Sequence, residues 1–179
     1  MIVPQVTQIG TGVIRKKAKP VKNAKAASVK KIVRGLIDSM RHHGLIGMAA
    51  PQIGKGLRIF VSEIRRTKTR KRQRRQDLDP LRVYINPVII FFSTQTVVDY
   101  EGCGSVAYAQ LFGRVRRPKT VVVEACDAKG VRFQLKAHGL LARVIQHEYD
   151  HINGTVFIDK VVDTKTMLSR QRYIRKFHK

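Results

Sequence analysis

Two stretches of the chain carry apolar residues at the spacing of a helix with one buried face. The first runs from Ser28, which can cap a helix N-terminus, to about His42. The second covers residues 139–152, and Gly154 just beyond it suits a helix C-terminus. A third helix is predicted after Asp163, another capping residue, and continues nearly to the end of the chain.

Short runs rich in β-branched and aromatic residues predict strands elsewhere. These runs occupy residues 57–62, 81–85, 88–92, 96–100, 120–126 and 131–137. Residues 127–130, with the sequence DAKG, separate the last two runs and are typical of a hairpin turn. Together with the helices, these runs indicate an α+β protein.

The charge of the chain is unusual, with 36 Lys and Arg against 12 Asp and Glu and a net charge of +24. Such an excess attracts polyanions such as nucleic acid or an anionic membrane surface. The basic residues concentrate in residues 1–37, 65–75 and 164–179. Apolar residues make up 43% of the chain, which allows a core and excludes a purely disordered basic tail. Residues 63–80 lack apolar periodicity, so we expect an exposed, inserted basic loop there.

Several sequence features bear on the location of the protein. No apolar run is long enough to cross a bilayer, and the N-terminus does not have the pattern of a secretion signal. The two cysteines lack the spacing of a disulfide framework, which favours a reducing compartment. We therefore expect a cytoplasmic, monomeric protein without a membrane partner.

The sequence HEYDH at residues 147–151 is the strongest sign of chemistry. In a helix, His147 and His151 lie on one face and can bind one metal ion, while Glu148 can hold a metal-bound water. An ordinary helix with two polar histidines would show the same spacing. The further ligands of zinc peptidases are missing, because Phe157 replaces a possible third histidine and no Glu follows His151.

Cys103 is a candidate for the third ligand. It lies between two glycines in the sequence EGCGS, residues 101–105, directly after a predicted strand. Two imidazoles and one thiolate would leave a tetrahedral ion one open position for water, as catalytic sites require. A lone cysteine is also common as a buried structural thiol, which is the role that we expect for Cys126.

The Gly-rich turn at residues 44–56 is a third feature. Its small residues would let the backbone approach a ligand closely. Gln52 carries an amide whose N–H can donate to a developing oxyanion. Taken alone, such a loop is more often a plain turn than a binding site.

Together, the three segments resemble the peptide deformylase family, which carries the motifs GxGxAAxQ, EGCxS and HExDH in this order. The chain has IGMAAPQ at residues 46–52, EGCGS at residues 101–105 and HEYDH at residues 147–151. The similarity extends from about Val13 to Asp159. It implies an α+β fold in which strands in small antiparallel or mixed sheets surround a central metal-binding helix.

The resemblance also implies an activity, the metal-dependent removal of the formyl group from formyl-methionyl nascent peptides with release of formate. The catalytic domain would cover residues 1–162, and residues 163–179 would form a basic C-terminal helix. The metal of this family is usually Fe²⁺, although Zn²⁺, Ni²⁺ or Co²⁺ can occupy the site.

Carried over residue by residue, the resemblance assigns roles to the site residues. The expected metal ligands are Cys103, His147 and His151. The residues expected to act on the formyl amide are Glu148, Gln52 and Gly104. Of these, the glutamate would move the proton, while the glutamine amide and the glycine N–H would stabilise the oxyanion. The residues expected to hold the peptide and its methionine side chain are Ile46, Gly47, Leu140 and Val144.

The chain departs from the family pattern at three positions. Leu45 replaces the first Gly of GxGxAAxQ, Gly104 follows the cysteine where bacterial members commonly have Leu, and Ala107 replaces a frequent Pro. None of these changes removes a ligand, so we expect an active enzyme whose rate the changes can reduce. Arg143, one helical turn before the first histidine, either pairs with Glu101 or faces solvent.

Two other hypotheses remain open at this point. One is a catalytically weak deformylase-like protein that acts mainly as a ribosome-binding or RNA-binding factor. The other is a hydrolase of a different small amide. The basic segments can also be simply solvated. In bacterial deformylases the C-terminal helix docks on the ribosome, so the resemblance implies ribosomal RNA as a partner of residues 164–179.

Overall fold

The computed structural model describes residues 5–66 and 78–177 of the chain. Its α-helices are α1 (Ala27–His42), α2 (Gly139–Ile152) and α3 (Arg170–Phe177). Its strands are β1 (Gly47–Ala49), β2 (Ile59–Ile64), β3 (Asp79–Phe92), β4 (Thr96–Gly102), β5 (Leu111–Pro118), β6 (Thr120–Cys126), β7 (Arg132–His138) and β8 (Leu168–Ser169). The described part of the chain is therefore an α+β protein, as predicted.

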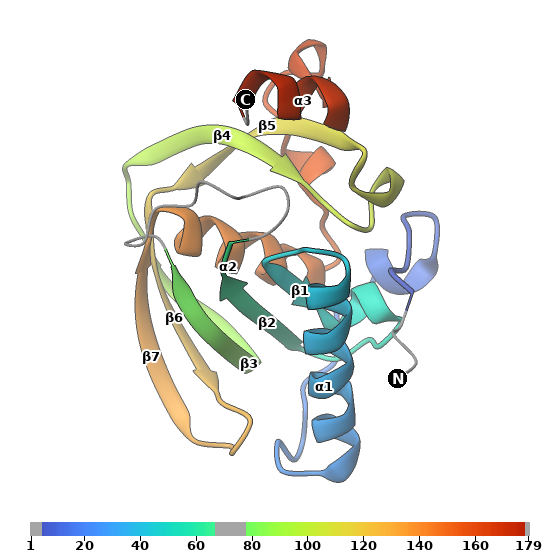
Figure 1. Cartoon of the computed structure of the whole chain (residues 1–179). Helices are drawn as coiled ribbons and strands as arrows, with labels where there is room; N and C mark the ends of the chain where they lie inside the picture. Colours follow the sequence, from blue (N-terminus) through green and yellow to red (C-terminus); the bar gives the residue numbers. More distant parts are fainter. Residues whose placement is uncertain (1–4, 67–77, 178–179) are drawn as a thin grey trace.

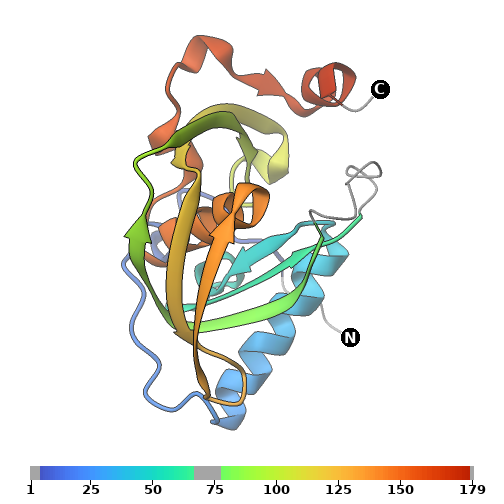
Figure 2. The ribbon, with the colours of Figure 1, turned by 90° about the vertical axis from the view of Figure 1, so that its left-hand side faces the viewer.

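The strands form two antiparallel sheets with α2 between them (Figure 1). The larger sheet has the order β1-β2-β3-β6-β7, and the smaller sheet has the order β4-β5-β8. Figure 2 shows the larger sheet curving beside α2, with the smaller sheet and α3 beyond the helix. This confirms the expected arrangement of small sheets around a central helix.

The two faces of the larger sheet are covered by different helices. On β2, Ile59 and Val61 belong to the core cluster of α1, whereas Phe60 between them belongs to the cluster of α2. This alternation follows from the two-residue period of a strand. Both faces are apolar here, and burial of a large apolar side chain stabilises a fold by about 1.5–3 kcal/mol.

The helix boundaries agree only partly with the predictions. α2 has the predicted bounds, and Gly154 beyond it is in the left-handed conformation with φ 78°. α1 begins one residue before Ser28, and its N-terminal cap residue is Ala26, without a side-chain hydrogen bond. The prediction of Ser28 as the cap was therefore wrong, because this residue lies inside the first turn.

The C-terminal segment differs more clearly from its prediction as one helix from Asp163. The Asp163 side chain does accept a hydrogen bond from the Lys165 N–H, but it caps only a short 3₁₀ turn. The chain then runs extended as β8, which pairs with β5, and α3 begins only at Arg170. Main-chain bonds to the open edge of β5 satisfy this segment in place of helix bonds. The division of the chain between residues 162 and 163 stays a prediction.

Three strand predictions also need correction. β5 was not predicted, because three arginines and a glycine dilute its apolar alternation. β3 is one strand where two were predicted, with a bulge at Asn86, whose φ is 52°. The predicted loop 63–80 overlaps β2 and β3 at its ends, and its residues 67–77 lie outside the described residues.

Among the described residues, no helix has the length and apolar character needed to cross a membrane.

Candidate metal centre and active site

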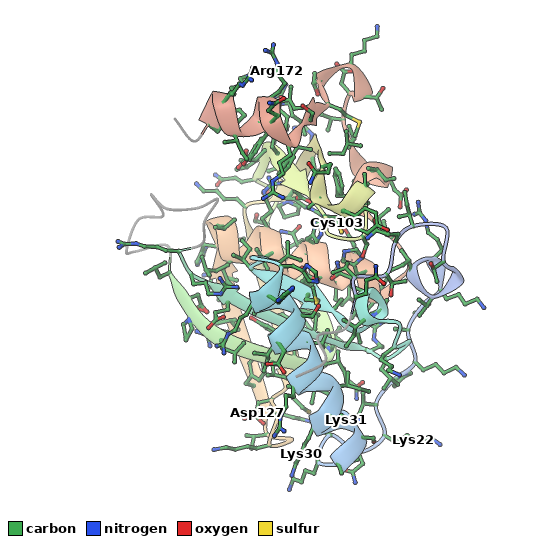
Figure 3. The ribbon with its side chains drawn as sticks, turned by 45° about the vertical axis from the view of Figure 1, so that its right-hand side comes forward. Lys22, Lys30, Lys31, Cys103, Asp127 and Arg172 are labelled. Atoms are coloured by element: carbon green, nitrogen blue, oxygen red, sulfur yellow. The ribbon has the colours of Figure 1, made fainter. Side chains whose placement is uncertain are left out.

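The fold places the HEYDH sequence opposite the cysteine. α2 packs Ile145 and Ile152 into the core of the larger sheet, so that His147 and His151 turn toward the smaller sheet. Cys103 follows β4, which belongs to that smaller sheet. Figure 3 shows Cys103 between the smaller sheet and α2.

The three predicted metal ligands lie close together. The ligand atoms of Cys103, His147 and His151 are all within 4.8 Å of one another, and the Cys103 Sγ lies 3.2 Å from the His151 Nε2. Ligands of a tetrahedral ion with bonds of about 2.0–2.3 Å are about 3.3–3.7 Å apart, so these atoms can surround one ion. One thiolate and two imidazoles suit a divalent transition metal. The donor set therefore fits the metal that the motifs imply.

Glu101 fixes the orientation of His147. The His147 Nδ1 lies 2.9 Å from the Glu101 Oε2, so the Nε2 is the nitrogen that can bind a metal. Burial alone would raise the pKa of the Glu101 carboxyl. Hydrogen bonds from His147 and Arg117 outweigh burial and hold that pKa well below its usual range. The carboxylate therefore stays ionised and accepts the imidazole N–H.

A buried network of charges supports Glu101. The Arg117 guanidinium donates to both Glu101 oxygens at 2.9 Å and to the Asp150 Oδ2 at 2.5 Å. The Arg143 Nη1 donates to the Glu101 Oε1 at 2.6 Å, which confirms the pairing of these two residues. Asp150 also accepts a hydrogen bond from Lys160 at 2.6 Å. The buried carboxylates of Glu101 and Asp150 are thus paired with cations, which offsets the cost of their burial.

Glu148 lies in the pocket beside the ligands and is only 3% exposed. Burial raises the pKa of Glu148 to about 7. Its Oε2 is buried and has no hydrogen-bond partner among the described residues. A Cβ at Gly47 would collide with the Glu148 Oε1 and lie 2.8 Å from the Val144 Cγ1. Only a glycine at position 47 leaves room for this carboxylate, which is suited to proton transfer near neutral pH.

Gln52 presents its amide N–H groups to the cysteine loop. Its Oε1 accepts a hydrogen bond from the Ala49 N–H at 2.8 Å, which fixes the orientation of the amide. The Nε2 then lies 3.6 Å from the Cys103 Sγ and 3.3 Å from the Ser105 Oγ. Gly104 lies between these two residues and lines the same pocket.

A pocket of about 180 Å³ opens at this site. All predicted site residues except His151 line it, and His151 is fully buried behind them. The predicted residues in its lining are Ile46, Gly47, Gln52, Cys103, Gly104, Leu140, Val144, His147 and Glu148. The structure thus brings the candidates from all three motifs together, while their individual roles stay predictions. Cys126 is half-buried at the end of β6, outside the lining of this pocket.

Several residues near the site were missed in the sequence. Arg117 is two residues after Val115 in β5, so both side chains point to the buried face of the strand. The alternation of a strand would have placed Arg117 inside if β5 had been predicted. The pocket is also lined by Phe112 and by α3 residues, including Tyr173, which stacks on Phe112 with a centroid distance of 4.1 Å. No local pattern in the sequence indicates that α3 folds back to the pocket.

The departures at positions 45 and 104 lie side by side. A Cβ at Gly104 would be 3.1 Å from the Leu45 Cδ1 and 3.3 Å from the Val6 Cγ1. The Leu45 side chain therefore fills space next to the glycine, at the rim of the pocket. A larger residue at position 104 would require Leu45 or Val6 to move.

Comparisons with known proteins agree on one family. The model of the polypeptide deformylase family matches residues 3–167. A peptide deformylase from Dictyoglomus turgidum is 34% identical over 166 residues, which cover 93% of this chain and 97% of the relative. A Met-Ala-Ser-bound class I type b peptide deformylase from Acinetobacter baumannii has a TM-score of 0.81 at 26% identity, covering 89% of this chain and 100% of that one.

A peptide deformylase from Synechococcus elongatus, solved in complex with actinonin, has a TM-score of 0.80 at 31% identity. This match covers 92% of the present chain and 83% of the other. The sequence match spans nearly the whole chain, and the same chain brings one cysteine and two histidines together as a metal-capable group. On these grounds, the chain belongs to the polypeptide deformylase family.

Proposed function

We propose that this chain removes the N-terminal formyl group from formyl-methionyl nascent peptides and releases formate. The observation that carries this proposal is that Glu148 and Gln52 line the same pocket as Cys103 and His147, which form one metal-capable group with the buried His151. A metal-capable group, a buried carboxyl and an oriented amide are the parts that hydrolysis of a small amide requires.

Cys103, His147 and His151 would hold the metal, with Fe²⁺ as our proposed ion. When bound, the ion supplies a water that is acidic enough to lose a proton near neutral pH. The thiolate and imidazoles do not by themselves exclude Zn²⁺, Ni²⁺ or Co²⁺. Metal analysis of anaerobically purified protein distinguishes these ions, and Fe²⁺ is the expected result.

Glu148 would take a proton from the attacking water and pass it to the leaving amine. Its buried position keeps competing water away, and its raised pKa lets it both accept and release a proton. The Gln52 Nε2 and the Gly104 N–H would donate to the oxygen of the formyl group as charge develops there. Loss of one such donor costs about 2.7–4 kcal/mol in a well-studied hydrolase.

The substrate peptide would lie along β1. Within the described part of the chain this strand is at the edge of the larger sheet, with β2 on one side, so an extended peptide can add to its other side. Ile46 and Gly47 would form this edge, while Leu140 and Val144 would line the pocket for the methionine side chain. The Acinetobacter baumannii neighbour bound to Met-Ala-Ser supports a peptide substrate of this kind.

The direct test is formate release from formyl-Met-Ala-Ser by the iron-loaded protein under anaerobic conditions. We expect turnover, with a preference for methionine over alanine at the first residue. Turnover without this preference would favour a hydrolase of another amide. Absence of turnover, combined with salt-sensitive ribosome binding, would favour the hypothesis of a mainly RNA-binding protein.

The exchange of Gly47 for alanine is expected to reduce turnover at least tenfold, because the new Cβ displaces the Glu148 carboxylate. The matched control is Gly56→Ala, where, among the described residues, the nearest atom to a new Cβ is the Val13 Cγ2 at an ordinary contact distance of 3.9 Å. Formate release and metal content are measured for both variants. Equal activity of the two variants would contradict the proposed position of the base.

We further propose that the basic outer side of α3 holds the enzyme near ribosomal RNA. Arg172, Arg175 and Lys176 are exposed, and Figure 3 shows Arg172 on the helix at the far end of the molecule from α1. Removal of residues 164–179 is not a clean test of this proposal, because Arg170, Tyr173 and Ile174 line the pocket.

Charge reversal at Arg172, Arg175 and Lys176 together is therefore the better experiment. We expect weaker binding in a ribosome-pelleting assay, with a smaller salt dependence, because fewer phosphate contacts release fewer counterions. Turnover of formyl-Met-Ala-Ser should stay unchanged. The same reversal at Lys30, Lys31 and Arg34 of α1 controls for total charge. Equal effects of the two triple variants would argue for nonspecific attraction.

The monomeric state and cytoplasmic location stay predictions.

A further inference from the structure

The N-terminal segment at residues 5–9 connects the two loops that carry the proposed oxyanion donors. The Thr7 N–H donates to the backbone oxygen of Gln52 at 2.8 Å. Two residues later, the Ile9 N–H donates to the backbone oxygen of Ser105 at 2.9 Å. One short segment therefore fixes the turn of Gln52 relative to the loop of Cys103.

The side chain between these two bonds belongs to Gln8. Its Nε2 donates to the Gly104 carbonyl at 2.8 Å and to the Val6 carbonyl at 3.1 Å. Its Oε1 accepts from the Tyr108 N–H at 3.1 Å. A single half-buried amide thus bridges the beginning and the end of the loop at residues 104–108.

This loop closes on itself through backbone hydrogen bonds, in which the Val106 and Ala109 N–H groups donate to the Cys103 carbonyl at 3.1 Å, but it keeps an unfavourable backbone conformation. Gly104 has no side chain to pack, although its neighbours approach closely. Ala107, Tyr108 and Ala109 have φ values of 45°, 52° and 59°, in the left-handed region that side chains disfavour. External bonds add to the internal ones in stabilising this conformation, and Gln8 supplies two of them.

We propose that Gln8 is a positioning residue, which holds the Cys103–Tyr108 loop so that the Gly104 N–H and the Gln52 amide converge on one oxygen. This inference rests on the proposed function, in which these two groups form the oxyanion site. Gln8 does not line the pocket and acts through Gly104. A misplacement of a catalytic group by about 1 Å can lower a reaction rate about 100-fold, so a less rigid loop should lower the turnover number.

The main test compares Gln8→Ala with Gln5→Ala, an exposed glutamine of the same segment. Both iron-loaded variants are assayed with formyl-Met-Ala-Ser. For Gln8→Ala we expect kcat to fall about tenfold with KM and metal content unchanged. The displaced oxyanion donors would stabilise the transition state less, while the residues that bind the substrate stay in place. Gln5→Ala should behave as the unaltered enzyme does.

Two further measurements separate positioning from simple loss of stability. Val33 lies on the buried face of α1, away from the pocket, so Val33→Ala should lower the stability of the protein. At a temperature where this variant is folded, its kcat should be unchanged. Hydrogen exchange of the Tyr108 amide should become faster in Gln8→Ala, because its acceptor is removed. It should stay unchanged in Gln5→Ala.

The outcomes distinguish this inference from the proposed function. An active wild-type enzyme with equal kcat in Gln8→Ala and Gln5→Ala would overturn the role of Gln8 alone. A kcat loss in Val33→Ala as large as that in Gln8→Ala would overturn it as well. A wild-type enzyme that releases no formate would overturn the proposed function, and the inference would fall with it.

Discussion

Replacement of Glu148 by glutamine is expected to lower kcat for formate release by about 10²–10⁴, the usual contribution of a general acid–base group. Glutamine has nearly the same shape but cannot take a proton from water at neutral pH. The carboxyl is 3% exposed and its Oε2 has no hydrogen-bond partner among the described residues, so an amide group there would break no hydrogen bond of this oxygen. The variant should therefore fold and bind metal normally.

The matched control for this variant is Glu124→Gln. Glu124 is exposed on β6 and accepts a hydrogen bond from the Gln134 Nε2 at 3.1 Å, so the same change of charge occurs outside the lining of the pocket. Formate release and iron content are measured for both proteins. If Glu148→Gln kept more than a tenth of the wild-type kcat at full iron occupancy, the assignment of the base would be wrong.

Replacement of Arg117 by methionine is expected to lower the free energy of unfolding by about 3–5 kcal/mol, the usual cost of removing one partner of a buried ion pair. Arg117 is 3% exposed and joins Glu101 to Asp150 by three hydrogen bonds. Methionine fills a similar volume but removes all three of these hydrogen bonds and one of the positive charges beside the two carboxylates. Because Glu101 also orients His147, the metal should bind more weakly too.

The neighbouring Arg116 provides the control, since it is exposed on the opposite face of β5. Urea unfolding of Arg117→Met and Arg116→Met, at equal metal content, gives the two changes in free energy. Arg116→Met should change stability by less than about 0.5 kcal/mol, as surface substitutions usually do. Similar small losses in both variants would show that the buried network contributes little to the fold.

The metal-binding helix could be predicted almost completely from the sequence. Its apolar period sets the bounds Gly139–Ile152, and helical geometry alone puts His147 and His151 on one face. The motifs also contain many of the residues that line the pocket, because close backbone approach, thiolate ligation and amide donation each need particular residue types. These properties depend on a few consecutive residues and are therefore visible in the chain itself.

The surroundings of the site could not be predicted in the same way. Arg117 lies 16 residues after Glu101 and 33 before Asp150, and only the register of β4 and β5 and the packing of α2 bring the three together. Gln8 lies 96 residues before Gly104, to whose carbonyl it donates. Such contacts join residues far apart in the chain, and a single sequence has no local signal for them.

The sequence by itself determined the metal-capable residues, the helix that carries two of them, and a net charge of +24 that comes mainly from three basic blocks. The tertiary structure decided that Cys103 lies beside His151, 48 residues later in the chain, and which cations pair with the buried Glu101 and Asp150. It also decided that α3 starts only at Arg170 and reaches the pocket. The described part of the C-terminal basic block, residues 164–179, therefore forms a basic surface and also contributes residues to the lining of the pocket. The physical reason is that local residue preferences fix helices and motifs, whereas sheet pairing and buried charge depend on residues far apart in the chain.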